Sequence, residues 1–288
     1  MPSIFSNHLP STGQRGLFHD YTASTWLPQL KQILTGGNLN AVFQPILNLR
    51  DGVILGYEGL VRGPVEGPLH SPLNLLRVAQ ANNLTVEIES LCCRTVLTQF
   101  VNLGLEGKLF LNLSPQVLGQ MSISGPAIMD LLDQIGLRAD QIVIEVTENH
   151  CPPTEYHYIN ATLACYRELG FQIALDDLGE GFSTLRRWSE LHPDYVKIDM
   201  HFIQGIATSP LKQSFVQAIR DIANASGAMI VAEGIETAEE LEFLADFGVL
   251  CGQGYYIARP ESSPMLMPGV ELRQTLSAIR QRASNVLC

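Results

Sequence analysis

Short hydrophobic runs recur along most of this chain, and a polar residue stands near the point where several of them end. Seven such residues are Glu58, Asn112, Glu145, Asp176, Asp177, Lys197 and Glu233. Barrels of alternating strands and helices display functional groups in this way, because the carboxyl ends of their strands open at one mouth. Five of the seven are carboxylates, which would repel each other there unless cations were bound. The pattern therefore predicts a barrel with a divalent-metal site.

Composition narrows the class of protein. The 288 residues are 46% hydrophobic, enough for a large core, and the net charge is −11 without a block of like charge. This charge argues against a partner that is a nucleic-acid polymer or an anionic membrane. A small anionic substrate is still compatible with this net charge, because bound metal can make the local charge positive.

The six cysteines lack Cys-x-x-Cys spacing. They are interpreted as reduced small hydrophobes, with zinc ligation or disulfides as the alternative. They are Cys92, Cys93, Cys151, Cys165, Cys251 and Cys288.

The ends of the chain carry no sign of a membrane or export segment. No apolar run approaches the roughly 18 residues of a membrane span, and the first residues lack the apolar core of a signal peptide. We therefore expect a cytoplasmic protein without a transmembrane segment. Residues 1–22 are predicted to be a loose arm, and residues 23–288 to form one barrel domain. A helix capped by Ser24 or Thr25 and a C-terminal helix are expected to flank that barrel.

Strand-like and helix-like segments alternate after the first helix. The predicted strands are 41–47, 53–61, 109–113, 142–147, 171–176, 195–199, 228–233 and 249–252. The predicted helices start at 71–72, 86, 126, 152–153, 209–210, 237 and 270. Asp51-Gly52 lies in a link too short for a helix, so the first two strands should form an antiparallel hairpin. The later links fit helical crossovers. The expected fold is α/β, a modified TIM-type (β/α)8 barrel with one antiparallel strand, and an open doubly wound sheet is the alternative.

Several candidate site residues have two readings at this stage. Glu58, Leu60 and Arg62 share one strand face, and the charged pair is either a buried ion pair or a metal ligand beside a phosphate clamp. Asn112 is either a cap for the backbone or a neutral oxygen ligand. Lys197 needs polar partners inside its apolar run. Those partners are either Asp199 in a structural salt bridge or carboxylates and a substrate phosphate.

The acidic residues that follow the middle strands are also ambiguous. Asp176 and Asp177 reach one site only if their strand ends there, with Gly179 and Gly181 making the turn; otherwise they are a solvated acid pair. Glu145 lies inside its apolar run and is predicted to be a ligand. Glu148, three residues later, should face elsewhere and organise a loop.

The predicted ligands are carboxylate and amide oxygens, without a cluster of cysteine or histidine. Hard oxygen ligands favour Mg²⁺ or Mn²⁺ over zinc or copper. Because Arg62 and Lys197 would lie nearby, a phosphate ester is the expected substrate.

The motifs now form an ordered set that resembles the EAL-type cyclic di-GMP phosphodiesterase domain, over about residues 40 to 262. Glu58-Gly59-Leu60 stands where the family has Glu-Ala-Leu. The other matching segments are FQPILNL (43–49), LNLS (111–114), EVTE (145–148), DDLGEGFSTL (176–185), KID (197–199), EGIE (233–236) and QGYY (253–256). The resemblance implies a barrel with one antiparallel strand. It also implies hydrolysis of one phosphodiester of cyclic di-GMP to linear pGpG.

The resemblance also implies a role for each matching residue. Two Mg²⁺ or Mn²⁺ ions would be held by Glu58, Asn112, Glu145, Asp176, Asp177 and Glu233. The catalytic group would comprise Glu58, Lys197, Glu233 and Gln253, with Lys197 and Gln253 orienting water and Glu233 a candidate general base. Substrate would be bound by Gln44, Leu60, Arg62, Asn112, Asp177 and Glu236. Glu148, Gly179 and Gly181 would organise the loop. Two ions would lower the pKa of a bridging water from about 16 towards about 7, and the larger Ca²⁺ is expected to inhibit.

The chain departs from the family pattern mainly in one loop. Leu178, Glu180 and Phe182 replace the family's Phe, Thr and Tyr, which bears on regulation more than on chemistry. In the family this loop contributes to dimerisation, so a homodimer through residues 178–188 is expected, with Leu185 and Trp188 as core residues of a short helix in the alternative. Two other functions compete: a degenerate domain that binds cyclic di-GMP without cutting it, and an unrelated metal-dependent barrel enzyme.

Overall fold

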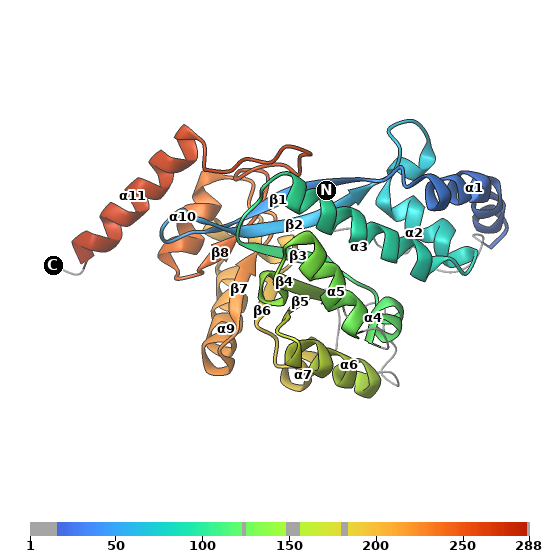
Figure 1. Cartoon of the computed structure of the whole chain (residues 1–288). Coiled ribbons are helices and arrows are strands. Elements are labelled where there is room, and N and C mark those ends of the chain that lie inside the picture. The colour runs from blue at the N-terminus through green and yellow to red at the C-terminus, as the bar shows by residue number, and fades with distance from the viewer. Residues whose placement is uncertain (1–15, 123–124, 148–155, 180–183, 287–288) are drawn as a thin grey trace.

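The chain folds into a closed barrel of eight strands that run in chain order around it (Figure 1). The computed structural model describes residues 16–122, 125–147, 156–179 and 184–286. The strands are β1 (Asn40–Asn48), β2 (Ile54–Arg62), β3 (Lys108–Asn112), β4 (Ile142–Thr147), β5 (Gln172–Leu178), β6 (Tyr195–Ile198), β7 (Met229–Ala232) and β8 (Cys251–Gly252). All eight coincide with predicted segments to within about three residues at either end, which confirms the expected α/β barrel.

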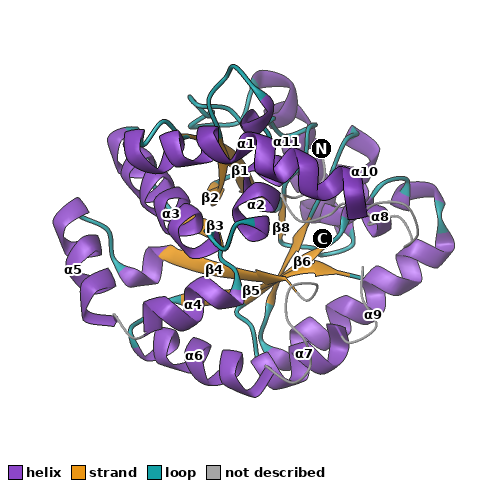
Figure 2. Cartoon of the chain, turned by 90° about the vertical axis from the view of Figure 1, so that its right-hand side faces the viewer, coloured by secondary structure: helices purple, strands orange, loops and turns teal. Residues whose placement is uncertain are grey.

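Helices encircle the strands, as Figure 2 shows. They are α1 (Gly16–Gly36), α2 (Pro72–Ala81), α3 (Thr85–Asn102), α4 (Pro115–Ser122), α5 (Gly125–Ile135), α6 (Tyr156–Glu168), α7 (Thr184–Leu191), α8 (Met200–Ile203), α9 (Pro210–Ser226), α10 (Ala238–Asp246) and α11 (Val270–Val286). Helix α10 begins with the predicted capping box, in which Thr237 and Glu240 satisfy each other's backbone N–H groups. Helix α9 begins at Pro210 after the cap Ser209 and ends at Gly227, which has a left-handed φ of 77°.

The first strand is the antiparallel one. Strand β1 pairs antiparallel with both β2 and β8, whereas the remaining neighbours from β2 to β8 are parallel. The turn between β1 and β2 is closed by side chains, because Asn48 Oδ1 accepts from Arg50 N at 2.9 Å and Asp51 Oδ1 accepts from Val53 N at 2.8 Å. Gln44 of β1 thereby lies opposite Glu58 of β2.

A plug of apolar side chains fills the barrel and sets the depth of the site. The plug residues are Ile46, Phe110, Val143, Ala174, Tyr195, Val231 and Cys251. Two residues further toward the mouth, on the same inward face, stand Gln44, Asn112, Glu145, Asp176, Lys197, Glu233 and Gln253. Successive residues of a strand alternate between faces, so this offset of two places a polar layer directly above the apolar one. The antiparallel β1 runs the other way, which is why Gln44 precedes Ile46.

The N-terminal boundary differs from the sequence prediction. Helix α1 begins at Gly16, so residues 16–22 are helical and the predicted arm boundary at residue 22 is wrong. Serine and threonine are favoured as caps but are also tolerated inside helices, so Ser24 and Thr25 mark no start. Residues 1–15 lie outside the described residues. Helices α4 and α8 were not predicted either, because each has eight residues or fewer and spans too few turns to show a periodic pattern. Helix α7 is the short helix expected to carry Leu185 and Trp188.

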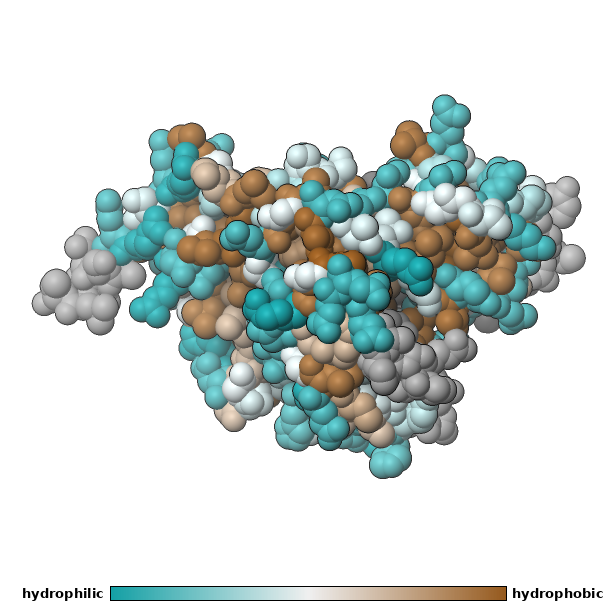
Figure 3. Space-filling view, in the orientation of Figure 1, coloured by the Kyte–Doolittle hydropathy of each residue, from teal (hydrophilic) through white to brown (hydrophobic). Residues whose placement is uncertain are grey.

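Two further expectations can be compared with the structure. Cys92, Cys93, Cys165 and Cys251 are free thiols, as expected, and the other two cysteines lie outside the described residues. Among the helices that the structure describes, none is both long enough and apolar enough to cross a membrane. On the face shown in Figure 3, hydrophobic and hydrophilic residues are interspersed.

Candidate active site

The polar layer forms the floor of a cavity of about 580 Å³ at the carboxyl end of the barrel. Seven of the predicted site residues line it: Gln44, Glu58, Leu60, Arg62, Glu233, Glu236 and Gln253. Asn112, Glu145, Asp176, Asp177 and Lys197 stand on neighbouring strands, and the contacts described below tie them to that floor. The structure therefore brings the predicted residues together.

Lys197 is the centre of this layer. Its Nζ lies 2.7 Å from Glu145 Oε1, 2.8 Å from Glu233 Oε1, 3.1 Å from Asp176 Oδ1 and 3.7 Å from Glu58 Oε2. The lysine side chain is fully buried. Asp199, the alternative partner, instead caps helix α8, where its Oδ1 accepts from His201 N at 2.8 Å. The charge of Lys197 thus belongs to the acidic layer.

Burial and crowding shift the ionisation of these groups. Burial would lower the pKa of Lys197, but the surrounding carboxylates reverse this and hold that pKa well above its usual value. Burial is the main cause that raises the pKa of Glu145 and of Glu233 well above the ordinary range, although Lys197 opposes it. The pKa of Asp176 is raised for the same reason. Each of these three carboxylates therefore ionises at a higher pH than an exposed carboxylate does.

Two amides brace the carboxylates from the sides. Gln253 Nε2 donates to Glu58 Oε2 at 2.7 Å and to Glu233 Oε1 at 3.1 Å. Asn112 Nδ2 donates to Glu58 Oε1 at 3.1 Å. Both oxygens of Glu58 are therefore held by amide groups, which fixes the position of this carboxylate before any ligand binds.

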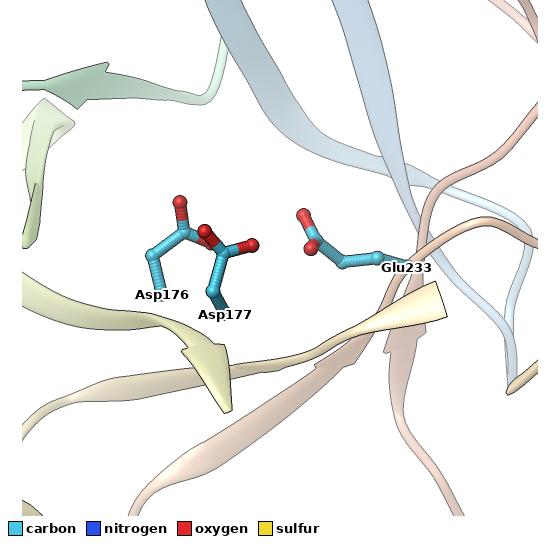
Figure 4. Close-up of side chains that lie close together, drawn as sticks. All are labelled: Asp176, Asp177 and Glu233. Carbon is cyan, nitrogen blue, oxygen red and sulfur yellow. The ribbon is translucent and has the colours of Figure 1, made fainter. Parts of the chain in front are cut away.

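Asp176 and Asp177 both reach the site because the backbone turns at Asp177 itself. Asp177 has a φ of 54°, and the β5–β6 register shifts between Leu175 and Leu178. Oxygens of Asp176, Asp177 and Glu233 lie within 4.8 Å of one another, and Figure 4 shows the carboxylates of Asp177 and Glu233 pointing toward each other. The turn was expected at the glycines Gly179 and Gly181. Gly179, two residues after Asp177, also has a positive φ, of 118°.

The loop residues can be judged only in part. A side chain at Gly179 would meet the ring of Phe202, so this glycine also permits a close approach between β5 and helix α8. Glu148, Glu180, Gly181 and Phe182 lie outside the described residues, so their predicted roles stay predictions.

The donor set fits divalent cations. Asn112 Oδ1, Glu145 Oε2 and Gln253 Oε1 are buried acceptors without a hydrogen-bond partner in the described part of the chain. Buried acceptors normally find a partner, so such oxygens beside a cluster of three carboxylates call for a cation. Oxygen donors without histidine or thiolate suit Mg²⁺ or Mn²⁺.

The cavity also contains residues that sequence analysis did not assign to a site. Examples are His70, Met200, Tyr255 and Arg259. Arg259 lies with its guanidinium carbon 4.0 Å from the centre of the Tyr255 ring. His70, Tyr255 and Arg259 follow the ends of β2 and β8 in segments without a periodic pattern, and Met200 begins the four-residue helix α8. The sequence signal that could have pointed to Arg259 is its position three residues after the QGYY motif (253–256).

The comparison with known families agrees with this geometry. The model of the EAL domain matches residues 28–260 of the chain. This protein belongs to the EAL domain family. Glu58-Gly59-Leu60, which carries the family's name with glycine for alanine, supplies Glu58 to the acidic layer and Leu60 to the cavity wall.

Individual relatives share sequence and fold with this EAL domain. Cyclic di-GMP phosphodiesterase NbdA of Pseudomonas aeruginosa is 31% identical over 261 residues, which are 88% of this chain and 32% of NbdA. The chain spans 40% of the length of the first curated relatives it matches. A standalone EAL protein of Vibrio cholerae in its c-di-GMP-bound form has a TM-score of 0.73 at 27% identity, covering 82% of this chain and 97% of that one. Klebsiella pneumoniae BlrP1 in a manganese and cyclic di-GMP complex has a TM-score of 0.70 at 28% identity, covering 78% and 56%.

Proposed function

We propose that this EAL domain hydrolyses one phosphodiester of cyclic di-GMP to linear pGpG with two divalent metal ions. One observation carries the proposal: a single buried layer unites Lys197, the amides and all five carboxylates predicted from the sequence. NbdA is named as a phosphodiesterase for this nucleotide, and the BlrP1 structure holds it together with manganese. A domain that only senses the nucleotide would be expected to have lost a ligand position, and this chain retains them all.

The residues divide the work by position. Glu58, Asn112, Glu145, Asp176, Asp177 and Glu233 would hold the ions. When bound, the ions would polarise the scissile phosphate and lower the pKa of an attacking water. Lys197 Nζ and Gln253 Nε2 would orient that water, since both already converge on Glu233 Oε1. Glu233 would accept the proton of that water, because its Oε1 lies beside both groups that would orient the water.

Arg62 and its neighbours would hold the rest of the substrate. Arg62 lines the cavity on the same face of β2 as Glu58, so its guanidinium can grip a phosphate while Glu58 serves the metal. Gln44 donates Nε2 to Ala258 O at 3.0 Å and forms part of the wall beside it. Glu236 is exposed at the rim of the cavity.

A homodimer through the 178–188 region is part of the proposal, with a narrower surface than the sequence indicated. Trp188 is 2% exposed and donates Nε1 to Ser226 Oγ at 3.1 Å, so it packs inside and joins α7 to α9. Leu185 is 59% exposed and remains the candidate contact. Leu211, Phe215 and Ile222 of α9 are further exposed apolar residues.

The experiment that tests the activity uses purified protein, cyclic di-GMP and Mn²⁺, with the products separated by chromatography. We expect linear pGpG from the wild type and none from Glu58→Gln, which keeps the size of the side chain but removes its charge. Glu106→Gln is the matched control, because exposed Glu106 precedes β3 at the opposite end of the barrel. A wild type that binds the nucleotide in Mn²⁺ and leaves it intact would show that the chain is a receptor instead.

A further inference from the structure

The cavity is lined by two residues that the metal chemistry does not use. They are Arg259 and Tyr255, and the guanidinium is stacked on the ring at 4.0 Å. Cation–π stacking of this kind fixes the plane of the guanidinium. In the described part of the chain, the Arg259 guanidinium makes no hydrogen bond or ion pair with a protein acceptor. Its N–H groups therefore remain available to a ligand.

The segment that carries this pair is held firmly. Ile257 N and Ala258 N both donate to Gly254 O at 3.0 Å, which closes a turn between Tyr255 and Arg259. Phe43 N donates to Glu261 O at 2.9 Å, and Glu261 N donates back to Phe43 O at 3.2 Å. The segment is thus joined to β1, the strand that also carries Gln44. A side chain on such a support can read a ligand with a defined geometry.

The cavity carries groups of both charges. Arg62 and Arg259 line it together with Glu58 and Glu233 of the acidic layer. Burial lowers the pKa of Arg62, and interactions with Glu58 and Tyr255 oppose this, so both side chains lie near the Arg62 guanidinium. A ligand whose phosphodiester sits at the acidic layer would extend its base toward Tyr255 and Arg259.

We propose that Arg259 determines base specificity by donating two hydrogen bonds to the O6 and N7 atoms of guanine. This inference rests on the proposed function, since it concerns the base of the same cyclic dinucleotide. Guanine presents two acceptors on this edge, which match the two parallel N–H groups of a guanidinium, whereas adenine presents an N6 donor next to N7. The ring of Tyr255 orients the guanidinium, and the Tyr255–Arg259 pair forms the wall that selects guanine.

The test compares Arg259→Ala and Arg259→Lys with Arg138→Ala, an exposed arginine that precedes β4 at the other end of the barrel. Binding of cyclic di-GMP and of cyclic di-AMP is measured by calorimetry in Ca²⁺, and turnover of bis(p-nitrophenyl) phosphate is measured in Mn²⁺. We expect Arg259→Ala to weaken cyclic di-GMP binding by about tenfold and cyclic di-AMP binding by less than about twofold. The ammonium of lysine can also donate to O6 and N7 but lacks the fixed fork of the guanidinium, so Arg259→Lys should keep part of the preference for guanine that Arg259→Ala loses. The small diester does not extend to Arg259, so its turnover should be unchanged.

The outcomes separate this inference from the proposed function. Equal weakening of both nucleotides by Arg259→Ala would show that Arg259 contacts phosphate and would overturn the inference. A wild type that prefers cyclic di-GMP and loses this preference in Arg259→Ala, but forms no pGpG in Mn²⁺, would support the inference and overturn the activity. Unfolding temperatures of the variants equal to that of the wild type exclude a general loss of folding.

Discussion

Lys197 Nζ lies 2.7 Å from Glu145 Oε1 in the fully buried layer above the apolar plug. The same ammonium lies within 4 Å of three further carboxylates, so a single cation faces four acidic groups when no metal is bound. A buried charge is costly unless it is paired. Lys197 and a bound metal would therefore both neutralise the buried carboxylates, and the first two predictions follow from this shared role.

Removing the charge of Lys197 should destabilise the metal-free protein. Lys197→Met keeps most of the apolar stem and leaves the carboxylates without their cation, so the free energy of unfolding near neutral pH should fall by about 3 kcal/mol. The loss should shrink as the pH falls, because the carboxylates then become neutral, and it should also shrink in Mn²⁺. Denaturant unfolding with and without Mn²⁺ measures this. Lys31→Met, at an exposed site on α1, is the control; equal losses in both variants would contradict the prediction.

Metal affinity should rise with pH. The pKa values of Glu145, Asp176 and Glu233 are raised mainly by burial, so in the metal-free protein these groups hold protons at pH values where exposed carboxylates are ionised. A metal needs the ionised form, so Mn²⁺ binding must release protons and must weaken as the pH falls. Calorimetry in buffers of different ionisation enthalpy, from about pH 5 to about pH 8, counts the protons released. Affinity that does not change over this range would argue against these residues as ligands.

The identity of the metal should matter. Carboxylate and amide oxygens with a short spacing suit Mg²⁺ and Mn²⁺, whereas Ca²⁺ prefers longer bonds and more ligands. We expect turnover of cyclic di-GMP in Mg²⁺ or Mn²⁺, loss of turnover in a chelator, and inhibition when Ca²⁺ is added to the Mn²⁺ enzyme. Equal turnover in the chelator and in Mn²⁺ would refute a metal mechanism.

Glu58 and Arg62 should fail in different ways although they share one strand face. Glu58→Ala removes a ligand that Asn112 and Gln253 hold in place, so kcat should fall by at least about a hundredfold. Arg62→Ala removes a contact to substrate, so KM should rise by about tenfold with a smaller change in kcat. Steady-state kinetics of both variants measures the two parameters. An Arg62→Ala enzyme with unchanged KM and kcat would show that Arg62 does not bind the phosphate.

Strand-end chemistry made most of the site predictable. Asp51-Gly52 predicted the hairpin, and the apolar runs predicted the strands. In each such strand the site residue is the next residue after an apolar one on the inward face, as Glu145 is after Val143. The alternation of strand side chains makes such a position readable from spacing alone.

Other features depend on contacts that a sequence does not display. The positive φ of Asp177 arises where β5 meets β6, and neither aspartate signals it. From the sequence alone, Asp199 is a plausible partner for Lys197. In the structure Asp199 caps helix α8 instead, and the position of that helix is not visible in the sequence. The Tyr255–Arg259 stack follows from a turn after a strand of only two residues, β8. Each of these depends on how elements distant in sequence pack together.

Assembly should depend on Leu185. Because Leu185 is 59% exposed on α7 while Trp188 of the same helix is buried, Leu185→Asp alters the surface without disturbing the link between α7 and α9. We expect light scattering to show a dimer for the wild type and a monomer for this variant. Val270→Asp places the same charge at an apolar residue of α11 that is 65% exposed, and it should remain a dimer. The loop between Asp177 and α7 connects the proposed contact to the metal ligands, so the monomeric variant should also bind Mn²⁺ more weakly. A wild type that is monomeric at high concentration and fully active would exclude a dimer requirement.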